Sequence, residues 1–208
     1  MAGPAQSVLI AVASALLATT LSLALSGLIT GLSRRWKRAA HLAEIIGFLS
    51  LAASPFVIGT GLFILLNPYV DPFAVALPIT IAVNAALSLP FALRIILPAL
   101  SRAEHFYGRL GASLGMTGWT RFRLAIWPRI KRPVGFAAGL SAALSMGDLG
   151  VIALFAPPDV ATLPLTMYRL MSAYQMQAAS GVALLLIATS LALFWAFDRG
   201  GRLEHHIR

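Results

Sequence analysis

The 208-residue sequence contains no cysteine, so neither disulfides nor thiolate chemistry can contribute to its fold or function. Charged residues make up only 11% of the chain, and acidic residues are the rarest of them, with 7 Asp and Glu against 16 Lys and Arg. The 4 histidines show no metal-ligand spacing, and no glycine-rich phosphate-binding motif is present. The sequence therefore predicts no cofactor and no enzyme activity of its own, and any use of ATP is expected on a partner.

Long hydrophobic runs dominate the chain instead. Hydrophobic residues account for 59% of the sequence, and the mean hydropathy is +0.84. The runs reach about 20 residues or more, the length that crosses a hydrocarbon core of about 30 Å. The net charge of +9 lies in bands beside these runs, which does not indicate nucleic-acid binding. The sequence therefore predicts an all-α polytopic membrane protein.

About five transmembrane helices are predicted, at residues 6–32, 42–66, 73–97, 133–155 and 178–197. The first run is too long for the core of a signal peptide and no basic residue precedes it, so we expect a span there. Prolines inside the spans, such as Pro55 and Pro90, are compatible with ordinary kinked packing or with a lined transport path. Gly135 and Gly139 form a small-xxx-small pair that predicts close contact with another helix.

The distribution of basic residues predicts the orientation of these spans. With five spans, all Lys and Arg except Arg169 fall on one side of the membrane. The positive-inside rule places that side in the cytoplasm. The N-terminus is therefore expected outside and the C-terminus in the cytoplasm.

A basic segment, residues 98–132, separates the third and fourth predicted spans. Around Gly115 it is expected to form two short amphipathic helices joined by a turn. Trp119 and Phe122 are three residues apart and share one helix face, whereas Arg121 and Arg123 face elsewhere and can meet lipid phosphate or an acidic partner. The composition alone is typical of an interfacial helix held in lipid by aromatic and basic side chains.

The spacing within this segment carries more information than its composition. From Gly115, Phe122 lies seven residues on, Pro128 thirteen and Pro133 eighteen. This register resembles the cytoplasmic EAA loop of ABC importer permeases. In that loop, Glu-Ala-Ala is followed by three residues and a glycine, and the glycine is followed by nine residues and then I-x-L-P. The resemblance implies a coupling helix that docks into a groove on the ATPase subunit. Its candidate ATPase-coupling residues are Arg109, Gly115, Trp119, Phe122, Pro128 and Pro133.

The segment departs from that pattern at two places. Arg109, Leu110 and Gly111 stand where Glu-Ala-Ala is expected, and Ala125-Ile126-Trp127-Pro128 stands in place of I-x-L-P. The missing glutamate leaves open how the polar part of the docking contact is made.

A second resemblance accounts for these departures. Ser113–Pro133 and Leu144–Leu186, with "SMGDLGVIALF" and "TLPLTMYRLMSAY" as the most specific stretches, resemble the C-terminal half of the thiamine permease of bacterial ABC importers. The resemblance implies that residues 1–208 form one type I importer transmembrane domain in the bacterial inner membrane. It also implies four partners: a cytoplasmic ATPase dimer, a periplasmic substrate-binding protein, a second permease half from the same or another chain, and membrane lipid.

Two polar residues within the predicted spans are candidates for the substrate path. Asp148 follows "SMG" in the fourth span, and an ionisable group at that depth usually faces the bundle interior or water. It can attract the thiazolium cation of thiamine, or cap a helix break between Gly147 and Gly150. Asn84 can line the same cavity or form a hydrogen bond between helices.

Two other functions remain open from the sequence. One is an importer of the same type for ferric iron or another small solute, since few residues decide the substrate. The other is a membrane anchor that transports nothing and whose basic segment binds anionic lipid. Lipid binding requires arginines and aromatics but not the register of Gly115, Phe122, Pro128 and Pro133.

Overall fold

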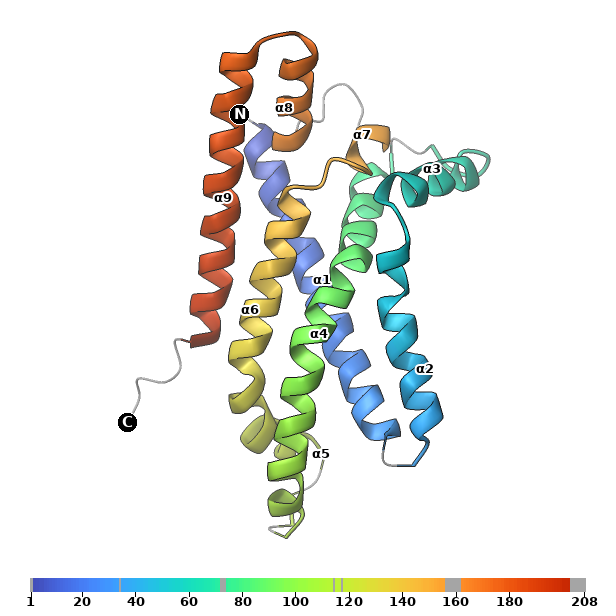
Figure 1. Ribbon diagram of the computed structural model, residues 1–208, viewed down its shortest axis with the longest axis vertical. Helices are drawn as coiled ribbons and strands as arrows, with labels where there is room; N and C mark the ends of the chain where they lie inside the picture. The colour runs from blue at the N-terminus through green and yellow to red at the C-terminus, as the bar shows by residue number, and fades with distance from the viewer. Residues whose placement is uncertain are drawn as a thin grey trace.

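The protein is a bundle of long helices. The computed structural model describes residues 2–33, 35–71, 74–113, 115–116, 118–155 and 162–202, and in these ranges it has helices and turns but no strand. The segments are α1 (Ala2–Leu32), α2 (Lys37–Phe48), η1 (Leu49–Ala52), α3 (Pro55–Leu66), α4 (Ala76–Ser113), α5 (Gly118–Arg121), the π-helix η2 (Phe122–Ile126), α6 (Trp127–Met146), α7 (Ile152–Phe155), α8 (Leu163–Ser172) and α9 (Met176–Arg202). Figure 1 shows α5 at one end of the bundle and α8 with the N-terminus at the other. The predicted all-α class is confirmed.

Small residues on α1 allow α1, α4 and α6 to approach one another closely. The buried face of α1 repeats every three or four residues, and its small residues include Ala11, Ser14, Ala15, Ala18, Ser22 and Ser26. The Ser22 hydroxyl donates a hydrogen bond to the Leu89 carbonyl of α4 at 3.3 Å. Lipid is as apolar as a leucine side chain, so helices in a bilayer associate through close packing and such hydrogen bonds.

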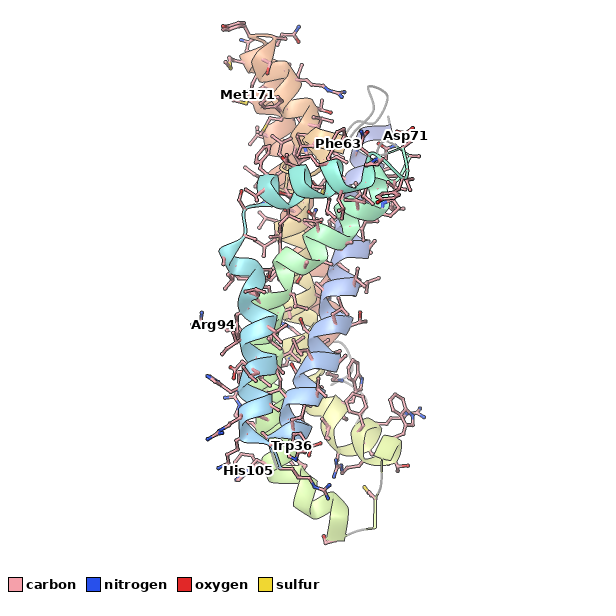
Figure 2. The ribbon with its side chains drawn as sticks, turned by 90° about the vertical axis from the view of Figure 1, so that its right-hand side faces the viewer. Trp36, Phe63, Asp71, Arg94, His105 and Met171 are labelled. Carbon is pink, nitrogen blue, oxygen red and sulfur yellow. The ribbon has the colours of Figure 1, made fainter. Side chains whose placement is uncertain are left out.

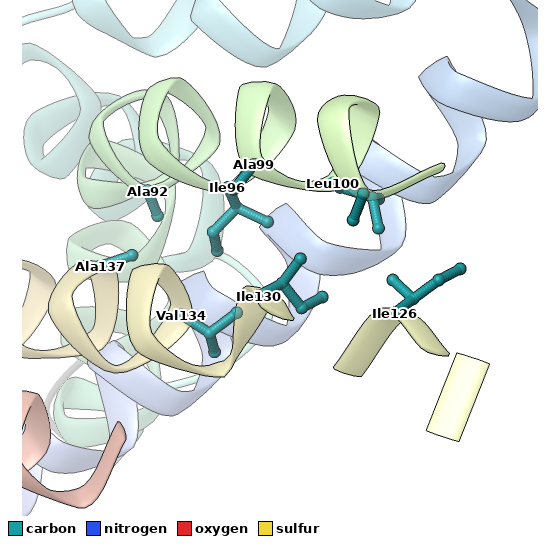
Figure 3. Close-up of a cluster of buried hydrophobic side chains, with 9 residues drawn as sticks. Ala92, Ile96, Ala99, Leu100, Ile126, Ile130, Val134 and Ala137 are labelled. Atoms are coloured by element: carbon teal, nitrogen blue, oxygen red, sulfur yellow. The ribbon is translucent and has the colours of Figure 1, made fainter. Parts of the chain in front are cut away.

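Larger aliphatic side chains fill the space between the C-terminal half of α4 and the start of α6. Ile96 and Leu100 of α4 pack against Ile126 and Ile130, as Figure 3 shows. The cluster joins the basic segment to the bundle, because Ile126 is the last residue of η2 and lies buried. The position of α5 is therefore tied to α4 through this core.

The glycine pair on α6 contacts α9, as the sequence predicts. A Cβ atom added at Gly135 would lie 2.8 Å from the Phe197 carbonyl oxygen, and one at Gly139 would lie 2.8 Å from that of Phe194. These separations are too short for a side chain, so only glycine permits this approach of the two helices. The predicted close contact is confirmed.

The second predicted span is bent sharply. Lys37–Ala52 and Pro55–Leu66 meet at 92°, so α3 runs across the bundle instead of continuing α2 (Figure 2). Ser54, with φ −76° and ψ 137°, is extended, as expected for a residue before proline. Pro55 is well suited to begin α3, because the backbone N–H that proline lacks would have no hydrogen-bond partner within the first turn of a helix. Residues 42–66 are therefore a broken or re-entrant segment.

The count of about five spans is not confirmed. Within the described ranges, three helices are long and apolar enough to cross a membrane, Gly3–Leu32, Ala76–Gly108 and Met176–Arg202, or up to four if the bent pair forms one span. Helix α6 is absent from this set because Arg129, Lys131 and Arg132 occupy its first turns. The 14 residues from Pro133 to Met146 extend only about 21 Å at 1.5 Å per residue.

The basic segment also differs from the expected pair of short helices. Helix α4 continues through Pro98 to Ser113, so the first expected helix is the end of α4 and not a separate element. The second is α5 and η2, which run directly into α6.

Candidate functional site

A polar pocket opens where α6 ends. Its volume is about 240 Å³, and Asn84, Ser88, Ser145 and Asp148 line it together with Pro55 and apolar neighbours from η1, α4 and α6. A second, narrower cavity of about 10 Å³ shares Asn84, Ser145 and Asp148 and extends towards α1 and α8. The two predicted path residues therefore line the same space, between the broken span and the centre of the bundle.

Asp148 lies just beyond α6 and outside any helix. Met146 ends the helix with Gly147 as its C-cap, and the next helical turn begins at Ile152. One carboxylate oxygen of Asp148, Oδ1, accepts a hydrogen bond from the Gly150 backbone N–H at 3.2 Å. The other, Oδ2, is buried without a hydrogen-bond partner among the described residues. The first contact is the one that a capping role requires, and the second oxygen is left without a described partner in a residue that lines the pocket.

Asn84 connects α4 to α6 across the pocket. Its side-chain Nδ2 donates to the Ser145 hydroxyl oxygen at 2.9 Å, and the residue is 2% exposed. Its Oδ1 is buried and accepts no hydrogen bond from the described part of the chain. Asn84 Oδ1 and Asp148 Oδ2 are thus two unpartnered acceptors on one pocket, an arrangement that favours an occupant with N–H donors or positive charge.

Gly150 holds the broken span against this pocket. A Cβ atom at Gly150 would lie 2.8 Å from the Cβ of Pro55, the first residue of α3. Gly59, on the next turn of α3, packs in the same way against Leu154 and Val151. The bend of the second span and the break after α6 therefore form one contact, and both border the pocket.

The turn before α5 depends on two glycines. Gly115 has φ +69° and Gly118 has φ +50°, in the left-handed region that residues with a side chain rarely adopt. They reverse the chain between the end of α4 and α5. The predicted glycine turn at Gly115 is therefore present.

Three aromatic rings gather on the outer side of this turn. Trp119 and Phe122 stack with centroids 5.5 Å apart at 26°, and Phe122 meets Trp127 at 6.1 Å. With Arg123 they line a cavity of about 270 Å³. Trp119 is 72% exposed, so the stack has an open face.

The other predicted coupling residues are distributed between α4 and α6. Pro128 and Pro133 both lie in the first two turns of α6, and Pro128 lies exposed next to Trp127 of the stack. Arg109 belongs to α4, and its side chain lies outside the described residues. The structure thus brings Trp119 and Phe122 together, with Pro128 one residue after Trp127 of the stack and Pro133 farther along α6.

Comparison with known proteins identifies relatives along nearly the whole chain. The sequence is 41% identical over 198 residues to the thiamine transport system permease protein of Brucella abortus strain 2308. The resemblance to the C-terminal half of a thiamine permease is confirmed. Thiamine transport system permease proteins of Escherichia coli K12 and Haemophilus influenzae are 33% and 35% identical and align with 93% and 90% of this chain. No family model matches the chain.

The chain is much shorter than these thiamine permeases. The alignment with the Brucella protein covers 94% of this chain but only 36% of the Brucella protein. The alignments with the Escherichia coli and Haemophilus influenzae proteins cover 36% and 35% of those proteins. It therefore corresponds to about one third of the polypeptides that it resembles.

The chain also contains an ion pair that the sequence does not predict. Arg121 Nη2 lies 3.2 Å from Glu104 Oε1, which joins α5 to α4. The aliphatic part of Arg121 crosses Gly111, where an added Cβ would lie 3.0 Å from its Cγ. The acidic partner of Arg121 is therefore within the chain. Charges 17 residues apart give no helical signal, and only the turn at Gly115 brings them together.

Proposed function

We propose that the chain is a transmembrane subunit of an ATP-driven importer that carries thiamine or its phosphates across the bacterial inner membrane. The observation that carries this proposal is 41% identity over 94% of the chain to a protein named as a thiamine transport permease. The chain covers 36% of that relative, so a second permease half, from the same or another polypeptide, completes the pathway. ATP is hydrolysed on a separate cytoplasmic ATPase dimer, and a periplasmic binding protein delivers the vitamin.

The proposed orientation follows from the basic residues. Arg35, Lys37 and Arg38 follow α1 at the end of the bundle where α5 also lies (Figure 1). The positive-inside rule assigns this end to the cytoplasm. The N-terminus is then periplasmic, and the α8–α9 connection faces the binding protein.

The aromatic stack is the proposed contact with the ATPase. Exposed, preorganised aromatic side chains are typical anchors of protein interfaces, where each fills a pocket on the partner. Trp119 and Phe122 present such a surface, and the core contact of Ile126 transmits its movement to α4 and α6. Nucleotide-driven movement of α5 then changes the packing of these two helices.

The pocket at Asp148 is the proposed substrate path. Its unpartnered Oδ2 supplies negative charge, and no basic side chain lines the pocket among the described residues. A fixed thiazolium cation compensates this charge as it passes, and Asn84 Oδ1 offers an additional acceptor.

Co-purification tests the assignment. The chain, expressed with its second permease half in the native membrane, should retain an ABC ATPase through detergent extraction and affinity purification. Purification without an ATPase would contradict the importer and support the anchor function.

A further inference from the structure

A second large cavity lies at the end of the bundle that carries α5. Its volume is about 400 Å³, and α1, α4, α5 and η2 line it. We call it the Gly27 cavity. Its apolar wall consists of Leu23, Ala24, Gly27, Leu100 and Phe122, and its polar rim of Thr30, Glu104 and Arg121.

Two glycines on α1 leave this cavity open. Nothing lies within 4 Å of a Cβ atom placed at Gly27 or at Gly31. The glycines of α6 behave in the opposite way, because α9 fills the space at Gly135 and Gly139. The surface of α1 at Gly27 is therefore unfilled by the described residues.

Arg121 places a guanidinium at the rim of the cavity, beside the Glu104 carboxylate that lines the same rim. Its Nη2 pairs with Glu104, but its Nε is buried and has no hydrogen-bond partner in the described ranges. A guanidinium has five N–H donors, and a phosphate can accept from several of them while Glu104 retains one. Arg35, Lys37 and Arg38, just beyond the end of α1, add basic charge at the same end of the molecule.

We propose that the Gly27 cavity binds one anionic phospholipid, with an acyl chain along Gly27 and Leu100 and its phosphate at Arg121. Basic pockets between transmembrane helices on the cytoplasmic side are typical sites for anionic head groups. An acyl chain gains no hydrophobic free energy by leaving the bilayer core, so it contributes through van der Waals contacts that fill the void. The guanidinium of Arg121 selects the anionic head group. The site connects lipid to α5 through Arg121, and it does not depend on which solute the importer carries.

Lipid retention in nanodiscs tests the proposal. The purified protein is reconstituted into phosphatidylcholine discs that contain a minor fraction of phosphatidylglycerol, and native mass spectrometry counts the lipids that remain bound after release. We expect one retained phosphatidylglycerol. Arg121→Gln should lower the preference for phosphatidylglycerol about fivefold, the factor equivalent to about 1 kcal/mol per basic residue.

Matched variants separate the cavity from general effects of charge and bulk. Gly27→Leu should abolish retention, whereas Gly181→Leu, at an equally open helical glycine on α9, should not. Arg123→Gln removes the same charge outside the cavity and should leave retention unchanged. If Arg121→Gln does not fold, Gly27→Leu alone decides the question.

Three results would overturn the lipid site. They are equal retention of phosphatidylglycerol and phosphatidylcholine, unchanged retention in Gly27→Leu, and a helix of another chain cross-linked at residue 27 in place of lipid. The measurement needs neither thiamine nor ATP, so its failure would leave the proposed transport function intact.

Discussion

Asp148 uses its two carboxylate oxygens differently. Oδ1 accepts the Gly150 N–H and so orders the break after α6, while Oδ2 lies buried at the pocket without a described partner. The observed cap and the proposed counter-ion role therefore depend on different oxygens of one side chain. A substitution that keeps the shape and removes the charge distinguishes them.

Asp148→Asn should lower thiamine uptake severalfold while the protein still folds and inserts. Asparagine can accept the Gly150 hydrogen bond, so a capping role survives the change. The attraction of a fixed cation to a carboxylate in a partly dry pocket does not survive it. Uptake of labelled thiamine into vesicles with the complete transporter, normalised to inserted protein, measures the effect. Near-normal uptake would leave Asp148 as a cap alone.

At the scale of elements, the structure depends on a few close contacts between helices. Gly135 and Gly139 allow α6 to meet α9, and Gly150 allows α3 to meet the break after α6. The first contact was predictable, because small residues four apart lie on one helix face. The second was not, because hydropathy counts Leu42 to Leu66 as one run. The bend at Pro55 depends on packing against a residue almost a hundred positions away.

Gly139→Leu should destabilise the α6–α9 contact by about 1–3 kcal/mol, the usual cost of overpacking. The added side chain would meet the Phe194 carbonyl oxygen, which is backbone and cannot move aside. Gly181→Leu on α9 provides the control, since its added atoms meet open space. Thermal unfolding in detergent should show a lower transition temperature for the first variant only. Equal transitions would contradict the observed packing.

The aromatic stack on α5 and η2 is the element that we expect to couple the chain to ATP. The contact between Trp119 and Phe122 was predictable from their spacing of three residues. The contact of Phe122 with Trp127 was not, because η2 is a π-helix and brings together residues five apart. The ion pair between Arg121 and Glu104 was also not predictable from the sequence. Arg121 therefore holds α5 in place and is not simply an outer charge.

Trp119→Ala should weaken assembly with the ATPase by about 2 kcal/mol or more, as expected for an exposed aromatic anchor that becomes buried. Arg123→Ala, at the edge of the same cavity, should cost less. Retention of the ATPase on the affinity-purified chain gives the comparison. Equal retention by the Trp119→Ala and unchanged proteins would exclude the stack as the docking surface.

For the whole molecule, the class of fold was predictable because composition and run length determine it. The number of spans was not, since α6 is short and basic at its start and the second run is broken. The structure also identifies where topology can be probed. Thr162 is buried at the start of α8, whereas Gln175 lies exposed between α8 and α9.

Single cysteines at Ser113 and Gln175 should react on opposite sides of the membrane. The chain has no native cysteine, so each label reports one position. An impermeant thiol reagent on intact spheroplasts should label Gln175→Cys, and it should label Ser113→Cys only after the cells are opened. The reverse pattern would overturn the orientation derived from the basic residues.

The proposal that this chain forms part of a thiamine importer is tested by uptake with the reconstituted transporter. Proteoliposomes would carry the chain and its second permease half in the bilayer, with the ATPase and ATP inside and the binding protein and labelled thiamine outside. We expect ATP-dependent accumulation that excess unlabelled thiamine abolishes and ferric iron does not. Accumulation of another solute in place of thiamine, or thiamine uptake that is the same without this chain, would contradict it.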